Sequence, residues 1–296
     1  MEQVIPVYDI CTLSPGGADD ILISRFAPYL DHHKNLSAAH RHSFYHLVLF
    51  TQGAGTHTID FEKFNVEPYQ VYFMIPGQVH SWSFEGLTDG YIINFSASFF
   101  QPFLLNPAYA ESFPFFGGDV KTSVITLPAR LHENVRQLFE RIILEAGRND
   151  ASGTDMIRVL MMQFFITVSR LSQESMLKGP ASYNQTLVHN FQKLTGEHYT
   201  RLKLPKDYAE MLYITPNHLN AVCKDILGVS AGDVIRNRLV LEAKRLLTNP
   251  QLNINEIAFT LNFSDNSYFT KFFKKAEGKT PEQFRKQILN VNHHEN

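Results

Sequence analysis

The sequence has little cysteine and no pattern that would pair the two cysteines it contains. Cys11 and Cys223 lie far apart along the 296 residues, and neither belongs to a CxxC motif. A disulfide-stapled scaffold is therefore excluded, and unpaired thiols are typical of a reducing compartment. We expect a cytoplasmic protein.

Long apolar runs are also lacking. The most apolar stretch, residues 159–168, would cover about half of a bilayer and contains Gln163. The N-terminal segment has neither the basic residues nor the apolar core that a secretory signal requires. We therefore expect no signal peptide and no membrane partner.

Neither sign of charge predominates, since 27 Lys and Arg residues face 29 Asp and Glu residues for a net charge of −2. That total points to no polyanionic partner. It is, however, the sum of two unequal parts: residues 1–181 hold 12 basic and 18 acidic residues, whereas residues 182–296 hold 15 and 11. The length predicts about two domains, and the basic excess makes the C-terminal one the candidate for binding nucleic acid.

The first 100 residues have the pattern of a β domain. Short strands are expected over residues 44–51, 56–62, 71–75 and 90–95. The sequence Gln-Gly-Ala-Gly at 52–55 predicts a turn, and His57 and Ile59 fall on the apolar face of the strand that follows. This spacing of strands and turns predicts a sandwich or barrel over about residues 20–100.

A helical period replaces the β pattern near residue 130 and predicts a helical hairpin over about 130–172, with a break near Gly147. The second helix, expected over 155–171, carries a wide apolar stripe made of Ile157, Leu160, Met161, Phe164, Phe165 and Val168. Two interpretations stay open. The stripe packs only on the β domain, or it is broad enough to form a dimer interface as well.

A polar segment that contains Gly179-Pro180, residues 173–184, is the expected linker. It separates a first domain, residues 1–172, from a second domain, residues 185–296, whose periodic segments are all helical.

The C-terminal third repeats itself at a spacing of 49 to 50 residues. Ala209 matches Ala258, Leu219 matches Phe269, and a long helix is expected between the copies, over about 232–247. Each copy has an apolar helix with a small alanine, a short turn, an N-cap and a second helix. This order is typical of a helix-turn-helix, because the alanine allows two helices to approach closely across a tight turn.

The N-caps locate the start of the second helix in each copy. Thr215-Pro216 supplies a capping hydroxyl followed by proline at the first helical position. In the second copy, either Ser264 or Asp265 is expected to be the cap.

Residues 204–286 resemble the DNA-binding domain of the AraC/XylS family of bacterial transcription regulators. The resemblance rests on Arg238-Leu239, Glu242-Ala243-Lys244, Glu256-Ile257-Ala258, Phe263-Ser264-Asp265, Ser267-Tyr268-Phe269, Phe273-Lys274-Lys275 and Thr280-Pro281. Where the family often has glycine in the second turn, this chain has Asn262, which tolerates a left-handed conformation. Tyr213 stands at the equivalent point of the first turn, so we expect an adjustment there.

The outward face of each recognition helix is the candidate reader of DNA. The helical period places Leu219, Val222, Cys223, Phe269, Phe272 and Phe273 on the buried faces. The outward residues, which match the family's base-facing positions, are Asn217, Asn220, Ala221, Lys224, Asn266, Ser267, Thr270 and Lys271. Asparagine suits adenine, and serine and threonine are permissive. Lys224 and Lys274 suit phosphates, which position a protein without specifying sequence.

Residues 40–82 resemble, more loosely, the cupin-like ligand-binding domain that is fused to many members of this family. The matching segments are residues 40–45, 53–56 and 75–82. The resemblance implies a β-barrel with a ligand pocket and leaves the ligand open. Trp82, the single tryptophan, would either stack on a flat ligand or form part of the barrel wall.

Four histidines belong to this region. His40, His42 and His46 share one face of a strand, and His80 follows a Pro-Gly turn. Metal-binding cupins hold an ion with an HxH pair, a carboxylate and a later histidine, and His46 stands here at the carboxylate position. The four side chains would suit Zn, Fe or Ni. We prefer the alternative, in which His40 and His42 lie at a pocket rim, His80 makes a local hydrogen bond, and no cofactor binds.

The sequence thus predicts a regulator and not an enzyme. We expect an α+β multidomain protein with a cupin-like β-barrel and helical hairpin, followed by an all-α domain with two helix-turn-helix motifs. A small-molecule effector in the barrel would control binding to double-stranded DNA. The family resemblance implies activation near RNA polymerase, often as a homodimer. A metal-binding cupin enzyme and a metal-sensing regulator remain the alternatives.

Overall fold

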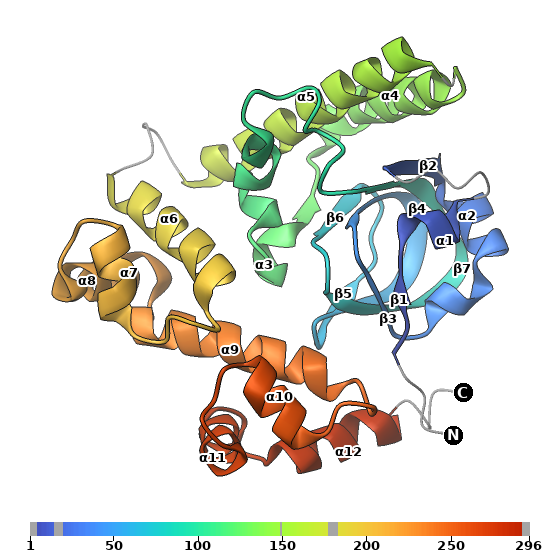
Figure 1. The fold of residues 1–296 in the computed structure, drawn as a ribbon. Coiled ribbons are helices and arrows are strands. Elements are labelled where there is room, and N and C mark those ends of the chain that lie inside the picture. Colours follow the sequence, from blue (N-terminus) through green and yellow to red (C-terminus); the bar gives the residue numbers. More distant parts are fainter. Residues whose placement is uncertain (1–4, 15–19, 149, 177–182, 292–296) are drawn as a thin grey trace. The chain divides into compact units, whose positions relative to one another are not determined.

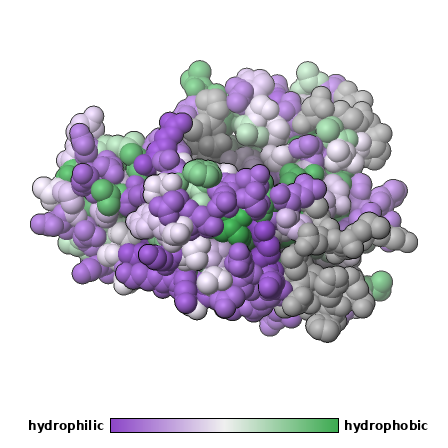
Figure 2. All heavy atoms as spheres, turned by 60° about the horizontal axis from the view of Figure 1, so that its bottom comes forward, coloured by the Kyte–Doolittle hydropathy of each residue, from purple (hydrophilic) through white to green (hydrophobic). Residues whose placement is uncertain are grey.

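A computed structural model describes residues 5–14, 20–148, 150–176 and 183–291 (Figure 1). Contacts divide the chain into two units, Pro6–Lys178 and Gly179–Asn296, with Met1–Ile5 assigned to the second. Hydrophilic residues predominate on the face that Figure 2 displays, because each unit buries apolar side chains in cores of its own. None of the described helices combines the length and the apolar character that a helix needs to cross a bilayer.

The N-terminal unit is built on one eight-stranded sheet. Its strands are β1 (Val7–Tyr8), β2 (Ile21–Arg25), β3 (His40–His42), β4 (Tyr45–Ile59), β5 (Glu62–Asn65), β6 (Gln70–Met74), β7 (Val79–Phe95) and β8 (Val124–Thr126). Their order is β1-β3-β7-β4-β6-β8, with β2 beside β7 and β5 beside β4. The two longest strands, β4 and β7, pair antiparallel from Tyr45 opposite Phe95 to Ile59 opposite His80. The sheet-rich domain predicted from the sequence is confirmed.

The glycine-rich segment at residues 52–55 lies inside β4 and does not form the expected turn. The register of β4 against β7 shifts twice between Phe50 and Ala54, which makes the segment a site of β-bulges. Gly55 has φ +114°, and a Cβ at this position would lie 2.2 Å from Ser83 O. Glycine is therefore required by the close approach of two strands rather than by chain reversal.

The chain reverses instead at Asp60-Phe61, within the segment 56–62 that the sequence predicted as one strand. Both residues have positive φ, 47° and 75°, as a two-residue hairpin turn of this kind requires. The buried Asp60 carboxylate accepts hydrogen bonds from Gln78 Nε2 (2.8 Å) and Val79 N (3.2 Å). These tertiary contacts hold a turn that has no Asn-Gly signal in the sequence.

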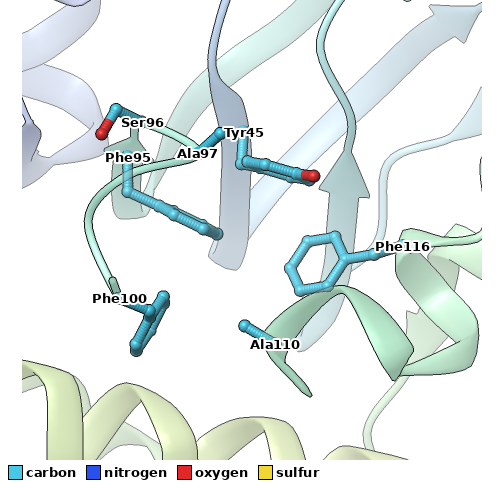
Figure 3. A pocket seen from close by; sticks show the side chains of 7 residues that line it. All are labelled: Tyr45, Phe95, Ser96, Ala97, Phe100, Ala110 and Phe116. Carbon is cyan, nitrogen blue, oxygen red and sulfur yellow. The ribbon is translucent and has the colours of Figure 1, made fainter. Parts of the chain in front are cut away.

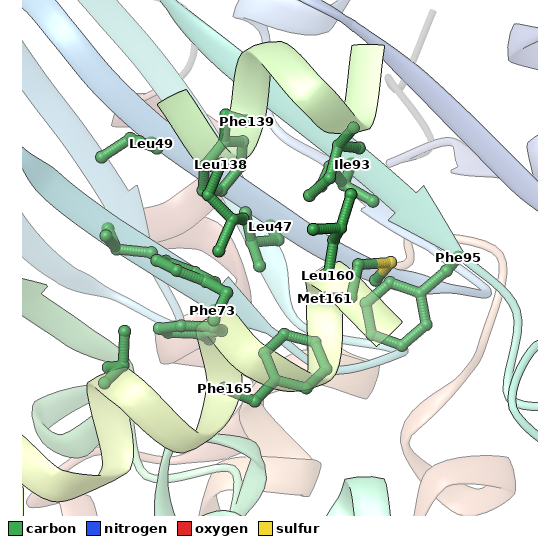
Figure 4. Packing of buried hydrophobic residues seen from close by; sticks show 14 of the residues in the cluster. Leu47, Leu49, Phe73, Ile93, Phe95, Leu138, Phe139, Leu160, Met161 and Phe165 are labelled. Atoms are coloured by element: carbon green, nitrogen blue, oxygen red, sulfur yellow. The ribbon is translucent and has the colours of Figure 1, made fainter. Parts of the chain in front are cut away.

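Two helices cover one face of the sheet. They are α4 (Ala129–Ala146) and α5 (Ala151–Met176), the hairpin predicted from the helical period. Figure 4 shows their apolar side chains packed against Leu47, Phe73 and Ile93 of the sheet. All six residues of the α5 stripe are buried in this cluster. The fold of one chain therefore uses the stripe completely, and a dimer contact would need other residues.

The opposite face of the sheet encloses a second core that is rich in rings. Its members include Phe26, Phe44, Phe50, Tyr72 and Trp82. Because side chains alternate along a strand, Leu47 faces α4 and α5 whereas Val48 faces this inner core. Short helices lie before and after the central strands: α1 (Ile10–Leu13), α2 (Phe26–His32), η1 (Lys34–Ser37), η2 (Pro107–Ser112), η3 (Pro114–Phe116) and α3 (Val120–Ser123).

Helices occupy both ends of the predicted linker, residues 173–184. α5 continues to Met176, so residues 173–176 are helical. Tyr183 and Asn184 belong to α6 (Tyr183–His198). Residues 177–182, which complete the predicted linker, lie outside the described residues.

The described part of the C-terminal unit is helical. It consists of α6 followed by α7 (Pro205–Met211), α8 (Pro216–Leu227), α9 (Ala231–Leu247), α10 (Ile254–Thr260), α11 (Asn266–Glu277) and α12 (Pro281–Val291). The pairs α7–α8 and α10–α11 are the two helix-turn-helix motifs that the repeat predicts. Ala209 and Ala258 are buried within them, and α9 is the expected connecting helix.

The two turns have the same backbone conformation in spite of their different residues. Tyr213 and Asn262 have φ values of 56° and 54°. Equivalent hydrogen bonds, from Ile214 N to Ala209 O and from Phe263 N to Ala258 O, close both turns at 2.9 Å. The adjustment that we expected at Tyr213 is absent, because the packing of the two helices imposes the turn.

Replacing Tyr213 with glycine is expected to stabilise the C-terminal unit by about 1 kcal/mol. The left-handed conformation costs a residue with a Cβ about 1–2 kcal/mol, part of which is offset by the backbone entropy of glycine. The Tyr213 side chain is 96% exposed, so little packing is lost. Calorimetry on the full chain should show a higher Tm for Tyr213→Gly and a lower one for Asn262→Val. An unchanged or lower Tm for Tyr213→Gly would contradict the assignment of strain.

Candidate DNA-binding helices and ligand chamber

The start of α8 is fixed by its cap. Thr215 Oγ1 accepts a hydrogen bond from His218 N (3.2 Å), and Pro216 occupies the first turn. Both features were predicted from the sequence. The inner face of the helix is buried and consists of Leu219, Val222 and Cys223. Three of the four predicted outward residues are exposed, namely Asn217, Ala221 and Lys224.

Asn220, the fourth, has a structural contact that the sequence did not reveal. Its side chain is half-buried, and Oδ1 accepts a hydrogen bond from Ala231 N (3.0 Å), at the first residue of α9. This bond satisfies one of the free N–H groups at a helix start. The Asn220 carbonyl oxygen has a second lone pair. The residue therefore positions α8 against α9 through this bond, and its base contact stays a prediction.

α11 repeats the same design with a different cap. Asp265, one of the two expected residues, accepts a hydrogen bond from Tyr268 N (2.7 Å). Phe269 and Phe273 are buried, whereas Phe272 is half-buried and packs on Phe263, with ring centroids 5.1 Å apart. The exposed outward residues are Asn266, Ser267, Lys271 and Lys274. Thr270 is half-buried and donates a hydrogen bond to Asn266 Oδ1 (3.1 Å).

Lys203 joins the segment before α7 to the turn of the second helix-turn-helix. Its Nζ donates a hydrogen bond to Asn262 O and lies 3.8 Å from the centroid of the Phe263 ring. Burial of the ammonium lowers the pKa of Lys203. The sequence did not reveal the role of Lys203, because no motif marks a contact across 59 positions.

Five histidines are buried together on the inner side of the sheet, and we call them the histidine chamber. His40 and His42 come from β3, His46 and His57 from β4, and His80 from β7, and each is at most 2% exposed. The strand register places His40 opposite His80. The alternation in the sequence predicted that His57 lies on an apolar face, but it did not place His57 in this group. The bulges in β4 shift the alternation, so His57 faces the same side as His46.

Three of these rings form a chain of close contacts. His42 Nε2 lies 2.8 Å from His80 Nε2, and His80 Nδ1 lies 3.1 Å from His57 Nε2. In each contact between two neutral rings, one nitrogen donates and the other accepts. His80 therefore lies at the centre of the chamber and uses both of its ring nitrogens.

The other two rings make hydrogen bonds to groups other than histidines. His40 Nδ1 donates to Ala38 O (2.7 Å), and His46 Nδ1 donates to Asn94 Oδ1 (2.7 Å). Several buried nitrogens have no hydrogen-bond partner among the described residues: His40 Nε2, His42 Nδ1, His46 Nε2, His57 Nδ1 and Trp82 Nε1. An unsatisfied buried nitrogen costs about 1–3 kcal/mol, so the chamber has unused capacity for polar interactions.

Burial keeps the imidazoles neutral. It lowers the pKa of His40 to about 4 and that of His46 to about 3, although the hydrogen bonds to Ala38 and Asn94 partly oppose the shift. The pKa values of His42, His57 and His80 lie well below their ordinary value, first because of burial and then because of repulsion from the neighbouring rings.

The chamber departs from the interpretation that we preferred from the sequence. His40 and His42 lie inside the unit rather than at a pocket rim, because β3 is paired on both sides, with β1 and β7. His80 bonds across strands instead of locally. The ring nitrogens of His40, His42 and His80 lie within 4.8 Å of one another and could together hold a metal ion. His46 is outside this trio.

Trp82 is packed among rings and has the position of a wall residue. It is 5% exposed, and its ring lies 5.1 Å from that of His80 and 5.5 Å from that of Phe26. Stacking on a flat ligand would require these neighbours to move.

The described residues of the N-terminal unit also line a small hollow and a larger one outside the chamber. Figure 3 shows the smaller one, of about 10 Å³, which is lined by Tyr45, Phe95, Ser96, Ala97, Phe100, Ala110 and Phe116. That volume suits about one water molecule. The larger one, of about 330 Å³, is open to solvent and is lined by Tyr8, Thr12, Leu13, Asp31, His32, His33, Asn35 and Leu36. Only the second has the size of a small-molecule site.

Comparison with protein families accounts for both units. Residues 24–165 match the AraC-like ligand binding domain, and residues 208–287 match a helix-turn-helix domain. The chain belongs to the AraC family of transcriptional regulators. It therefore combines a ligand-binding domain with a DNA-binding domain, as the sequence predicted.

Curated relatives and solved structures of AraC-type proteins resemble the chain at low identity. The transcriptional activator RhaR of Enterobacter sp. (strain 638) is 22% identical over 254 residues, which cover 85% of this chain and 88% of the relative. RhaR of Yersinia pestis bv. Antiqua (strain Angola) is 20% identical over 84% and 85% of the two chains. The structure of ToxT from Vibrio cholerae strain SCE256 with bound unsaturated fatty acid covers 90% of this chain and 95% of its own, with a TM-score of 0.43 and 12% identity.

Acidification is expected to destabilise the AraC-type ligand domain before it affects the rest of the chain. The pKa values of the five chamber histidines lie below the unfolded value of about 6.5, so the unfolded chain binds more protons below that pH. The stability that they contribute is complete above pH 6.5 and is lost as the pH falls towards 4, by up to about 1.4 kcal/mol per group and pH unit.

Trp82, the single tryptophan, lies inside the chamber and reports its unfolding by fluorescence. The denaturant midpoint should be lower at pH 5 than at pH 7.5, and the difference should shrink in His46→Gln. Equal midpoints at the two pH values would show that the histidines are not buried as neutral rings.

Proposed function

We propose that this protein is an effector-controlled transcriptional activator that binds double-stranded DNA through α8 and α11. The observation that carries the proposal is the duplicated helix-turn-helix. Both recognition helices are capped at the start, and each turn has one residue in the same left-handed conformation. Such a helix reads bases in the major groove with its N-terminal residues. The relatives named above are described as activators, which favours activation over repression.

The exposed faces suggest how the contacts divide between bases and phosphates. We assign base contacts to Asn217, Asn220, Ala221, Asn266, Ser267, Thr270 and Lys271. Lys224 and Lys274 lie nearer the C-terminal end of their helices, and we assign them to phosphates. Lys203 is a positioning residue for the second turn, and Asn220 also positions the start of α9.

Lys271→Ala and Lys224→Ala should affect DNA binding in different ways. Loss of a base contact lowers affinity for the cognate site by about 5- to 150-fold and leaves non-specific binding nearly unchanged. Loss of a phosphate contact weakens both and reduces the dependence of log K on log salt by about one. Footprinting on the promoters beside the gene would supply the cognate fragment for gel shifts.

Lys121→Ala, an exposed lysine of the ligand-binding unit, is the matched control for these gel shifts. Salt-insensitive binding, or the same affinity for every fragment tested, would contradict the proposal.

The effector domain acts by binding and not by catalysis in this proposal. A ligand changes the DNA affinity only if it prefers one arrangement of the chain over another. We expect the protein to work in the cytoplasm, where its DNA and RNA polymerase are, and to contact RNA polymerase when bound at a promoter.

We also propose that the chain acts as a homodimer through the outer side of α4 and α5. The apolar stripe of α5 is buried in the core of the N-terminal unit. Leu144, Met156 and Val159, in contrast, are exposed on α4 and α5. Three apolar side chains on the outside of an otherwise folded hairpin are candidates for a partner contact.

The dimer contact is tested by Leu144→Glu with Val159→Glu. Burying two carboxylates would disrupt the interface, so light scattering should show the mass of one chain for the variant and of two chains for the parent. Leu87→Glu, at an exposed leucine of β7, should stay dimeric. A parent that is monomeric at micromolar concentration, or a variant that remains dimeric, would rule out this surface.

A further inference from the structure

We propose that His40, His42 and His80 bind one divalent first-row transition-metal ion such as Zn²⁺, Ni²⁺ or Co²⁺, and that this ion is what the N-terminal unit senses. The sensing role rests on the proposed function, whereas the binding site stands on the geometry of the chamber alone.

The sheet itself sets the distances in the trio. His40 and His80 are directly opposite each other across β3 and β7, with ring centroids 4.1 Å apart. His42, two residues further along β3, lies 4.8 Å from both rings. One nitrogen of each ring comes within 4.8 Å of those of the other two. Small side-chain movements would bring three nitrogens to about 2.0–2.1 Å from one ion.

Two of the three rings in the trio have their outer nitrogens held in the way that metal ligands usually are, whereas His42 Nδ1 has no hydrogen-bond partner among the described residues. His40 Nδ1 donates to Ala38 O, which leaves the lone pair of Nε2 free. His80 Nδ1 contacts His57 Nε2, so His80 Nε2 is the nitrogen that faces His42. Such a second partner fixes the tautomer and the orientation of a metal-bound imidazole. His57 is therefore a positioning residue for His80.

A metal ion would use the polar capacity that the protein leaves unsatisfied. Packing alone does not explain five histidines in a core otherwise made of rings and aliphatic side chains, because each buried nitrogen without a partner is unfavourable. An ion would take the free lone pair of His40 Nε2 and replace the contact between His42 and His80. Neutral imidazoles also suit Zn, Ni, Cu and Fe better than Mg or Ca.

The chemistry of the trio argues against an organic anion as its direct occupant. The chamber rings are neutral, and among the described residues the groups in this cluster that could ligate one ion are all histidines. Three neutral ligands leave at least one coordination position open to water or to an anion. Trp82 and Phe44 pack beside the trio, with ring centroids 5.1 Å from that of His80 and 4.4 Å from that of His42.

Tyr8 borders both the trio and a hollow that is open to solvent. Tyr8 lines the open hollow of about 330 Å³ and its ring lies 5.6 Å from that of His40. It also pairs with His42 across β1 and β3. The hollow carries Asp31, His32 and His33, which are suitable first contacts for a cation. Movement of the two-residue strand β1 would connect the hollow with the chamber.

The test begins with metal content. The tag-free full chain is stripped with a chelator, incubated with Zn²⁺, Ni²⁺ or Co²⁺, desalted, and measured by elemental analysis. We expect one ion per chain for the parent, and at least a 100-fold loss of affinity in His42→Gln and His80→Gln. His57→Gln should weaken binding by 10- to 100-fold without abolishing it.

His198→Gln, at a partly exposed histidine of the C-terminal unit, should bind like the parent. Trp82 fluorescence checks that each variant is folded. A parent that retains no ion overturns the site even if every variant fails to fold, and so does a folded His42→Gln that still binds one ion per chain.

DNA binding, measured with and without the ion on the footprinted fragment, decides the sensing role. A change in affinity of fivefold or more that disappears in His80→Gln supports it. An ion that binds at the trio without changing DNA affinity overturns it. If the chain binds no DNA under any condition, the proposed function fails, and the metal content still decides the site.

Discussion

The pairing of β4 with β7 is the constraint on which the N-terminal unit depends. Their register sends alternate side chains to opposite faces, so that Leu47 and Ile93 pack on α4 and α5 while His46 and Asn94 point inward. A slip by one residue would exchange the two sets. The bulges beside Gly53 and Gly55 let the long strands bend. They also shift the alternation of side chains along β4, and His57 faces the inner side for that reason. One ladder of hydrogen bonds therefore sets the helix-covered core and the histidine chamber together.

The chamber is unusual in its energetics because it places five imidazoles where apolar side chains would fold more stably. Their neutrality is enforced by burial, and only some of their nitrogens are bonded, through Ala38, Asn94 and contacts between the rings. A group of this kind is kept when something binds to it or when its shape decides between two arrangements. This reasoning underlies our proposal that the signal enters at the chamber.

In the C-terminal unit, the main structural requirement is the positioning of two similar recognition helices, α8 and α11. The caps at Thr215 and Asp265 define where the recognition helices begin. Between them, α9 is tied to α8 through Asn220, and Lys203 holds the second turn. The turn is demanding enough to force Tyr213 into a left-handed conformation. Specific reading of DNA depends on such fixed offsets, because each helix must meet its own set of base edges.

The sequence by itself determined the elements whose causes are local. Two helix-turn-helix motifs and their buried faces could be predicted from the helical period, the alanines at 209 and 258, the Thr215 cap and the basic excess of the C-terminal part. The second cap was narrowed to Ser264 or Asp265. Only the tertiary structure decided what depends on partners far along the chain. The segment 52–55, predicted as a turn, forms bulges within a strand. Asn220 accepts a hydrogen bond from the start of α9. His57 joins the chamber through its contact with His80, whereas His46 bonds to Asn94. A sequence pattern predicts structure where the contacts of a residue lie within a few positions along the chain. It fails where strand register and close packing determine the contact.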